Sequence, residues 1–414
     1  MNSITKTFIT ASLIILSKAS YPQSSTYNPY SYFGLGEIDL ADHGISSGMG
    51  GTGIGIKSGY YINWMNPASY SGIDSLSVIF DVSFNVNTSR FKSLSQSYQV
   101  IDGNISKIAF GFRVFPRWAT SFGVVPYSKV GYKIDFQKQV EGTTGEYFDI
   151  SCSGNGGLSK VFWGNSYKLG KHISLGLNSS VLIGSITKSE NYYVPLVDKE
   201  WQVNRMYKPK STICFDLGFQ YTDSIGKDWQ YTFGAIGGNE KKISIKETYS
   251  TGTELTSEEE FVDKYNYWIP SYLGAGLSVR SKKWLLAADY RVQYWNTVRN
   301  KNEEFWLTNS HHFAIGTQYA PSNYNSKNIF DKIVYQVGAN YNRSYLKLNS
   351  QNIDSWGVSM GVIVPFRRQL SSLALSFEAG KKGLVTTGLF KENYYQLNLS
   401  ISLNDFWFIK RKYQ

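Results

Sequence analysis

A glycine-rich stretch near the N-terminus carries the most suggestive residue spacing in this chain. Gly48, Gly50 and Gly53 match the G-x-G-x-x-G spacing of a dinucleotide-binding loop, and Asp74 follows about twenty residues later, as a ribose-binding carboxylate would. That loop binds a pyrophosphate only where it joins a buried strand to a helix. The residues before Gly48 are polar and no helical pattern follows Gly53, so we expect no nucleotide site. Gly48, Gly50, Gly51 and Gly53 instead predict a segment that packs tightly against its surroundings.

Histidine and acidic residues are the next candidates for chemistry. The chain has 4 histidines, and a hydrolase would need one of them beside a serine and a third orienting group. His311 and His312 are adjacent in a predicted strand, where neighbouring side chains point to opposite faces, so they cannot bind one metal ion together. Residues 258–260 are all Glu but lack the ligand spacing of a calcium loop. The sequence therefore predicts no enzyme, no metal site and no cofactor.

The dominant pattern along the chain is an alternation of apolar and polar residues. In residues 395–408 four aliphatic side chains alternate with four polar ones, and three aromatic residues close the segment. Similar segments recur from Leu76 onward. An apolar lipid-facing side, a polar inner side and aromatic belts are what a bilayer requires of a closed barrel. We therefore predict an all-β fold, a transmembrane antiparallel β-barrel of about 14 strands.

Charged residues at the polar positions of this alternation are predicted to face the barrel interior. Charges inside a barrel commonly pair with one another and fill it, and a role in ligand passage is the alternative. Apolar residues at three inward positions (Ile79, Leu285 and Ile363) leave a ligand track open. The five charged candidates are Asp81, Asp216, Asp289, Arg291 and Glu378.

The connections between the predicted strands alternate in length. Tight turns are expected at Pro116 and at 223–227, 281–283 and 367–370, and long polar loops near 88–104, 188–208, 249–264 and 297–309. A barrel whose termini are periplasmic has short turns on that side and long loops outside. The connections thus predict which end of the barrel faces the periplasm.

The N-terminus has the features of an export signal. Lys6 precedes a short apolar core at 8–16, and residues 17–19 form a small-x-small cleavage site. We therefore predict a signal peptide at 1–19, an N-terminal plug at 20–74 and the barrel at 75–414. The expected location is the outer membrane of a Gram-negative bacterium.

The formal net charge is +11, which raises the question of a polyanionic partner. No basic helix or RNA-binding signature is present, so nucleic acid is not an expected partner. Many cations fall in the predicted turns, among them Arg117, Lys168, Lys171, Lys282 and Lys283. These positions indicate solvated turns near the headgroups of outer-membrane lipid.

The glycine-rich stretch is followed by Asn66-Pro67-Ala68 and then by a strand that begins at Leu76. This order resembles the FadL/TodX family of outer-membrane transporters for hydrophobic compounds. The resemblance implies a plug followed by fourteen strands, and a small hydrophobic ligand such as a long-chain fatty acid or an aromatic hydrocarbon. The plug and gate residues that it implies are Gly48, Gly50, Gly51, Gly53, Asn66, Pro67 and Ala68. We hypothesise that Asn66, Pro67 and Ala68 lie where the plug meets the wall and help to hold a lateral opening.

Two functions of different classes follow. The first is passive uptake of an apolar compound, which enters among the loops and leaves through a lateral gap in the wall. The second is a non-transporting scaffold that docks an envelope protein partner, a role that one relative in the family has in secretion. A continuous apolar track through the lumen would favour uptake, whereas a polar, sealed lumen would favour the scaffold.

Overall fold

The computed structural model describes residues 28–38, 43–94, 96–139, 147–194, 199–210, 212–253, 256–298, 306–321, 329–348, 350–366, 371–386 and 388–406. The predicted signal peptide lies outside these residues, as does the beginning of the predicted plug. No helix in the described ranges is both long and apolar enough to span a membrane.

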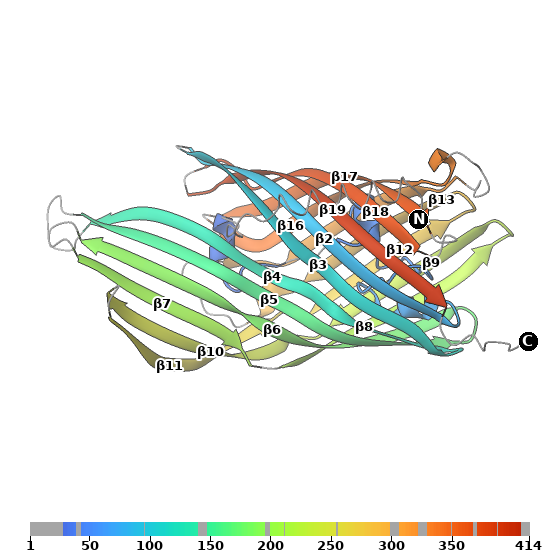
Figure 1. Cartoon of the computed structure of the whole chain (residues 1–414), viewed down its shortest axis with the longest axis horizontal. Coiled ribbons are helices and arrows are strands. Elements are labelled where there is room, and N and C mark those ends of the chain that lie inside the picture. The colour runs from blue at the N-terminus through green and yellow to red at the C-terminus, as the bar shows by residue number, and fades with distance from the viewer. Residues whose placement is uncertain are drawn as a thin grey trace, which may run out of the picture.

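Fourteen antiparallel strands form one closed ring (Figure 1). Each strand pairs with the next around the ring, and the last strand pairs with the first from Lys391↔Lys92 to Phe406↔Ser77. The barrel fold predicted from the alternation is therefore confirmed. In ring order the strands are β2 (Ser77–Lys92), β3 (Ser97–Phe115), β4 (Trp118–Gln139), β5 (Tyr147–Leu169), β6 (Ile173–Val194), β8 (Ile213–Ile225), β9 (Trp229–Gly238), β12 (Tyr272–Arg280), β13 (Trp284–Gln293), β15 (Ser310–Tyr319), β16 (Val334–Leu348), β17 (Gln351–Phe366), β18 (Ser371–Lys382) and β19 (Lys391–Phe406).

The strands end in tight turns at one end of the barrel and extend further at the other. One end, here called the turn end, holds the tight turns 116–117, 170–172, 226–228 and 281–283 together with Ser77 and Phe406. At the opposite end, the hairpin end, β4, β5 and β6 extend well beyond the rest of the ring (Figure 1). Their sheet continues through three further strands, β7 (Lys199–Pro209), β10 (Lys241–Thr253) and β11 (Thr256–Ile269), in the order β6–β7–β10–β11.

These extensions differ from the long loops that the sequence predicted. Residues 88–104, 188–208 and 249–264 belong almost entirely to strand hairpins (β2–β3, β6–β7 and β10–β11). Backbone groups make the ladder of hydrogen bonds, so a strand does not need a continuous apolar face. A strand outside the membrane can therefore lack the alternation that identifies a strand within it.

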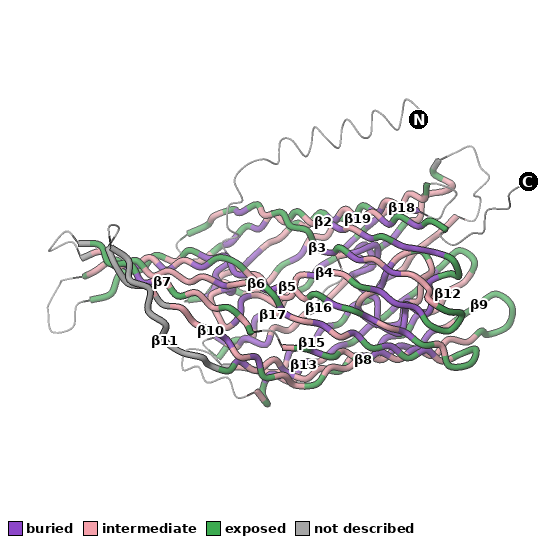
Figure 2. Tube along the Cα trace, turned by 60° about the horizontal axis from the view of Figure 1, so that its bottom comes forward, coloured by how far each residue is buried: buried purple, intermediate pink, exposed green. Residues whose placement is uncertain are grey.

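The alternation itself is present as predicted within the barrel wall. On β13 the side chains of Trp284, Leu286 and Tyr290 are exposed on the outside, whereas Leu285 and Asp289 are buried on the inside. β2, β17 and β19 follow the same rule. Buried residues gather along the body of the barrel, as Figure 2 shows. The interior is thus filled by wall side chains and by the chain that precedes β2.

Two stretches of that chain lie inside the ring. The N-terminal segment (residues 28–38) contains the 3₁₀ turn η1 (Pro29–Tyr32) and the short strand β1 (Glu37–Ile38), which pairs with β4. The inner segment (residues 43–74) contains η2 (Ile45–Met49) and η3 (Pro67–Gly72).

The N-terminal segment packs into an apolar cluster in the hairpin half of the barrel. Tyr30 and Leu35 of this segment are buried there. Trp295 of η5 (Trp295–Thr297) stacks on Tyr345 of β16 in the same cluster, with ring centroids 4.2 Å apart. The remaining short elements are β14 (Trp306–Leu307), which pairs with β16, and η6 (Ile329–Asp331).

Candidate functional site

Glycines of the wall allow the inner segment to approach several strands closely. Three pairs of glycines face each other across neighbouring strands, and all six approach the inner segment. A side chain at any of them would collide with it. The pairs, here called the wall glycines, are Gly176↔Gly218 on β6 and β8, Gly234↔Gly276 on β9 and β12, and Gly316↔Gly338 on β15 and β16.

The distances show how tight this docking is. A Cβ atom on Gly338 would lie 2.2 Å from the backbone nitrogen of Gly50, and one on Gly234 would lie 2.0 Å from the carbonyl oxygen of Ile54. Real Cβ contacts do not come closer than about 3 Å, because packing in protein interiors already places atoms at van der Waals distance. The inner segment therefore lies backbone to backbone on these strands.

The glycines predicted from the sequence make the matching half of the contact. A Cβ on Gly48 would lie 2.9 Å from Cα of Gly361, and one on Gly53 would lie 2.7 Å from Sδ of Met65. Gly50 and Gly51 have φ of 70° and 75°, in the left-handed region that favours glycine. All four thus serve to fold and seat the inner segment.

Asn66, Pro67 and Ala68 lie against β6 and β8. The Asn66 side chain accepts a hydrogen bond from the Ala68 N–H at 3.0 Å and donates to the carbonyl oxygens of Ile54 at 2.8 Å and Phe219 at 3.1 Å. Pro67 begins η3, where its missing N–H needs no partner. The ladder between β6 and β8 is continuous from Ile173 to Val181, so these three residues lie beside an intact part of the wall.

Two of the five predicted charged residues hold the inner segment from different sides of the ring. The carboxylate of Asp289 on β13 accepts hydrogen bonds from the N–H groups of Gly53 at 2.6 Å and Ile54 at 2.8 Å. On β2, Asp81 accepts from the Ile62 N–H at 2.7 Å and lies 3.4 Å from the Lys107 ammonium. Both carboxylates thus bind backbone donors that would otherwise be buried without partners.

The other three charged residues line two cavities of the lumen. Asp216 accepts from Lys160 at 3.0 Å and from Tyr272 at 2.9 Å, and Arg291 lines the same cavity of about 80 Å³. Glu378 accepts from Asn340 at 3.0 Å and Tyr394 at 2.9 Å. The partners of Asp216 and Glu378 are wall residues.

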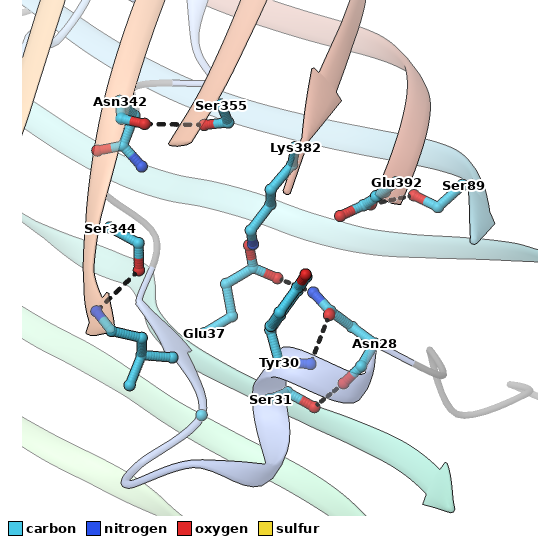
Figure 3. Close-up of polar contacts among 12 residues, drawn as sticks. Asn28, Tyr30, Ser31, Glu37, Ser89, Asn342, Ser344, Ser355, Lys382 and Glu392 are labelled. Atoms are coloured by element: carbon cyan, nitrogen blue, oxygen red, sulfur yellow. Dashed lines mark hydrogen bonds and ion pairs between the residues drawn. The ribbon is translucent and has the colours of Figure 1, made fainter. Parts of the chain in front are cut away.

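A larger polar cavity of about 230 Å³ separates the N-terminal segment from the inner segment. Figure 3 shows the side of it where the Lys382 ammonium pairs with Glu37, which also accepts from Asn28. Nearby, Ser89 donates to Glu392 at 2.6 Å. Amide side chains line much of the rest, namely Asn85, Asn87, Asn340, Asn342 and Gln396. The lumen at this level is polar.

The barrel wall has one stretch where neighbouring strands of the described chain separate. β3 and β4 pair only between Ile108↔Val124 and Phe115↔Trp118. Beyond Ile108, residues 97–107 of β3 pair with β2 alone, while residues 125–139 of β4 pair with β5 and, at Lys129 and Ser128, with β1. An ion pair between Asp102 and Lys129 bridges this β3–β4 slot.

One cation of the inner segment lies at the turn end. The Lys57 ammonium donates to the Ser174 hydroxyl at 3.0 Å. Burial, and to a smaller degree the nearby cations Lys168 and Arg113, lowers the pKa of Lys57 to about 8.

Sequence reasoning missed the wall glycines. Each of them sits at an inward position of a strand, but a lone inward glycine has no evident meaning. Their role depends on register, which places glycine opposite glycine on neighbouring strands. A pattern of inward glycines shared by several strands is the signal that could have identified them.

Comparison with known proteins identifies the family and the fold. A family model described as BamG matches residues 4–414. No curated protein matches the chain. The solved structures that match over most of their length include the CymD monoaromatic hydrocarbon channel (TM-score 0.57, 15% identity, 92% of this chain and 100% of that one), the P. putida toluene transporter TodX (0.57, 16%, 89% and 99%) and a Pseudomonas aeruginosa FadL homologue (0.61, 12%, 89% and 99%). The predicted resemblance to FadL/TodX proteins is confirmed at the level of the fold.

Proposed function

This chain belongs to the BamG family, and from that premise and the geometry of its lumen we propose a closed outer-membrane barrel that serves as a scaffold for another envelope protein. The docking of the inner segment on the wall glycines carries this proposal. It brings backbone against backbone on six strands, and two wall carboxylates fix it further. Among the described residues, the cavity of about 230 Å³ beside it is lined mainly by polar side chains, which disfavours an apolar track.

The outer surface supports a location in the outer membrane. Apolar side chains face outward along the wall, and exposed aromatic residues such as Trp118, Trp229 and Trp284 mark the turn end. Such a band between aromatic belts is the surface of a transmembrane barrel. By the usual orientation of bacterial barrels, the turn end faces the periplasm and the hairpin end faces outward.

The hairpin end supplies the surface for a partner. The extended sheet β4–β5–β6–β7–β10–β11 rises beyond the ring on one side (Figure 1). Its β6–β7 hairpin carries polar residues with an exposed aromatic, Trp201, whose side chain is 53% exposed. Aromatic residues among polar ones are typical of the anchors in protein interfaces.

The test is to shorten the β6–β7 hairpin and follow the complex. A two-residue turn that joins Ser189 to Asn204, which are paired across the hairpin, removes its tip together with the last residues of β6, which pair with β5, and leaves the strand ladders below Ser189 in place. We expect wild-type barrel in native membranes to migrate as a larger complex and the shortened variant to migrate alone. A matched variant with the β2–β3 hairpin shortened between Thr88 and Ile101 is the control. If the wild type also migrates alone, the scaffold proposal fails.

A second candidate function is uptake of hydrophobic compounds, and the β3–β4 slot is the observation that favours it. The slot leaves a lateral interruption in the wall, and the structural neighbours include proteins described as a hydrocarbon channel and a toluene transporter. The substrate would be an aromatic hydrocarbon or a long-chain fatty acid. Neither candidate involves bond-making chemistry, so we propose no enzymatic activity.

Cysteines at Asp102 and Lys129 would test uptake directly, because this ion pair bridges the slot. If the slot is a route, a reducible bis-methanethiosulfonate cross-linker joined to both cysteines should stop uptake of labelled toluene or oleate, and a reductant should restore it. Wild-type cells that take up neither compound faster than cells without the protein would exclude this candidate.

A further inference from the structure

A cluster of cations lies on the outer face of the barrel at the hairpin end. Its four members come from β2, β18 and β19, and all have the outward parity of exposed apolar residues on the same strands, such as Val86 and Phe377. Three of the four are exposed and one is half-buried. The members of this rim cluster are Arg90, Lys92, Lys381 and Lys391.

The strand register places these cations close together. Lys92 lies directly opposite Lys391, and Arg90 and Lys381 flank Asn393 from the two neighbouring strands. Directly opposed residues of an antiparallel pair have their Cβ atoms about 5 Å apart, and like charges in that position are destabilising. The wall therefore keeps an unfavourable arrangement at this point.

No acidic side chain of the described residues compensates for it from these strands. Glu378 and Glu392 face the lumen and pair there. The outward acid on the adjacent strand β17, Asp354, pairs with Arg343 at 3.4 Å and accepts from Tyr341 at 2.7 Å. The rim cluster thus has an excess of positive charge.

The same register sets the level of the cluster relative to the membrane. Trp356 faces Lys381, whose ammonium lies 5.5 Å from the indole centroid. In the other direction Trp356 faces Tyr341, which faces Phe313. The cations therefore continue a row of outward aromatic residues of the kind that marks the headgroup level of a barrel.

We propose that the rim cluster binds the phosphate groups of a lipid headgroup in the leaflet at the hairpin end. Arg and Lys are the side chains that bind phosphate, and several of them together can hold one phosphorylated headgroup. The apolar side chains below the cluster then contact the acyl chains. This proposal depends on the barrel fold and not on the scaffold role. Its ligand class is a membrane lipid with a phosphorylated headgroup.

The first test measures lipid retention by native mass spectrometry. The intact barrel is purified in neutral detergent and incubated with monophosphoryl lipid A or with the same lipid after its phosphate has been removed. We expect the wild type to retain the phosphorylated lipid at least tenfold better. The variant Arg90→Gln, Lys92→Gln, Lys381→Gln, Lys391→Gln should lose this preference.

The control changes the same number of charges at the opposite end of the barrel. Arg117→Gln, Lys171→Gln, Lys227→Gln, Lys283→Gln should keep the preference. If the control loses as much as the cluster variant, or if both lipids are retained equally by the wild type, the proposal is overturned.

A second test depends on a change of sign. Because Lys92 and Lys391 repel each other, Lys391→Gln should raise the unfolding temperature in neutral detergent. With the phosphorylated lipid bound, the same substitution should lower it, because a phosphate contact is lost. A shift of the same sign under both conditions would contradict the proposal. Because this test uses a single substitution, it applies even if the quadruple variant fails to fold.

Discussion

At the scale of single residues, the inner face of the wall leaves no room for a methyl group where the inner segment docks. Gly338→Ala should displace the segment, since the new Cβ would start 2.2 Å from the Gly50 nitrogen. Overpacking of this kind costs about 1–3 kcal/mol. We expect a lower temperature for the heat-induced mobility shift on gels and faster proteolysis of the inner segment. Ala339→Leu, on the lipid-facing side of the same strand, should change neither.

Asp289 makes a second residue-scale prediction, because its carboxylate binds two backbone donors. Asp289→Ala leaves the N–H groups of Gly53 and Ile54 buried without that acceptor, and each such loss costs about 1–3 kcal/mol. Asp289→Asn keeps a carbonyl oxygen and should be milder. The unfolding midpoints of the two variants in detergent check the order, and equal midpoints would contradict it.

Lys57 predicts a dependence on pH. Its pKa falls from 10.5 to about 8, so between these values the unfolded chain holds more protons than the folded chain. Stability linked to Lys57 should therefore rise as the pH increases from about 8 toward 10.5. Lys57→Met should remove that part of the rise. Unfolding midpoints of wild type and variant across this pH range give the comparison, and parallel curves would refute it.

The sequence allowed the side of the wall to be predicted for each residue but not its partners. A bilayer imposes the period of two locally, so Asp81 and Asp289 could be assigned to the interior from their neighbours alone. Their binding to Ile62, Gly53 and Ile54 depends on how a distant segment folds within the ring. The wall glycines could not be predicted for the same reason, because the residues that they contact are far away in the sequence.

At the scale of elements, the N-terminal segment is fixed by a pair of opposite charges. Glu37 on β1 pairs with Lys382 on β18 and so joins the segment to the wall (Figure 3). Glu37→Gln or Lys382→Met alone should destabilise the barrel more than half as much as both together, because each leaves one partner unpaired. A double-mutant cycle on the unfolding midpoint should give a coupling on the order of 1 kcal/mol. Additive effects would show that the pair does not hold the segment.

The hairpins show where element prediction from sequence ended. Apolar alternation identified the ring strands because the lipid-facing side of each strand must be apolar. The alternation ends where the strands leave the membrane. Residues 188–208 read as a loop because they lack a sustained apolar alternation, yet the backbone ladder of β6 and β7 is continuous from Ile186↔Tyr207 to Val194↔Lys199.

At the scale of the whole molecule, the docked inner segment predicts a barrel that does not conduct. We expect no steady ion current from the wild type in a planar bilayer. A variant that lacks residues 28–74 should show large, stable openings, since the contents of the lumen are then gone. The signature of a folded barrel on gels must be retained in that variant. Steady conductance of the wild type would mean that the lumen is open.

The contacts around the inner segment also constrain the order of assembly. Asp81 on β2 binds it from the first strand, and Ser402 on β19 donates to the Tyr60 carbonyl oxygen at 2.7 Å from the last. β19 is the final strand to emerge, and its ladder with β2 closes the ring. Strands contact the segment from opposite sides of the ring, which hinders its entry once the ring is closed. We therefore expect the ring to close around the segment, when β19 pairs with β2, rather than to receive it after closure.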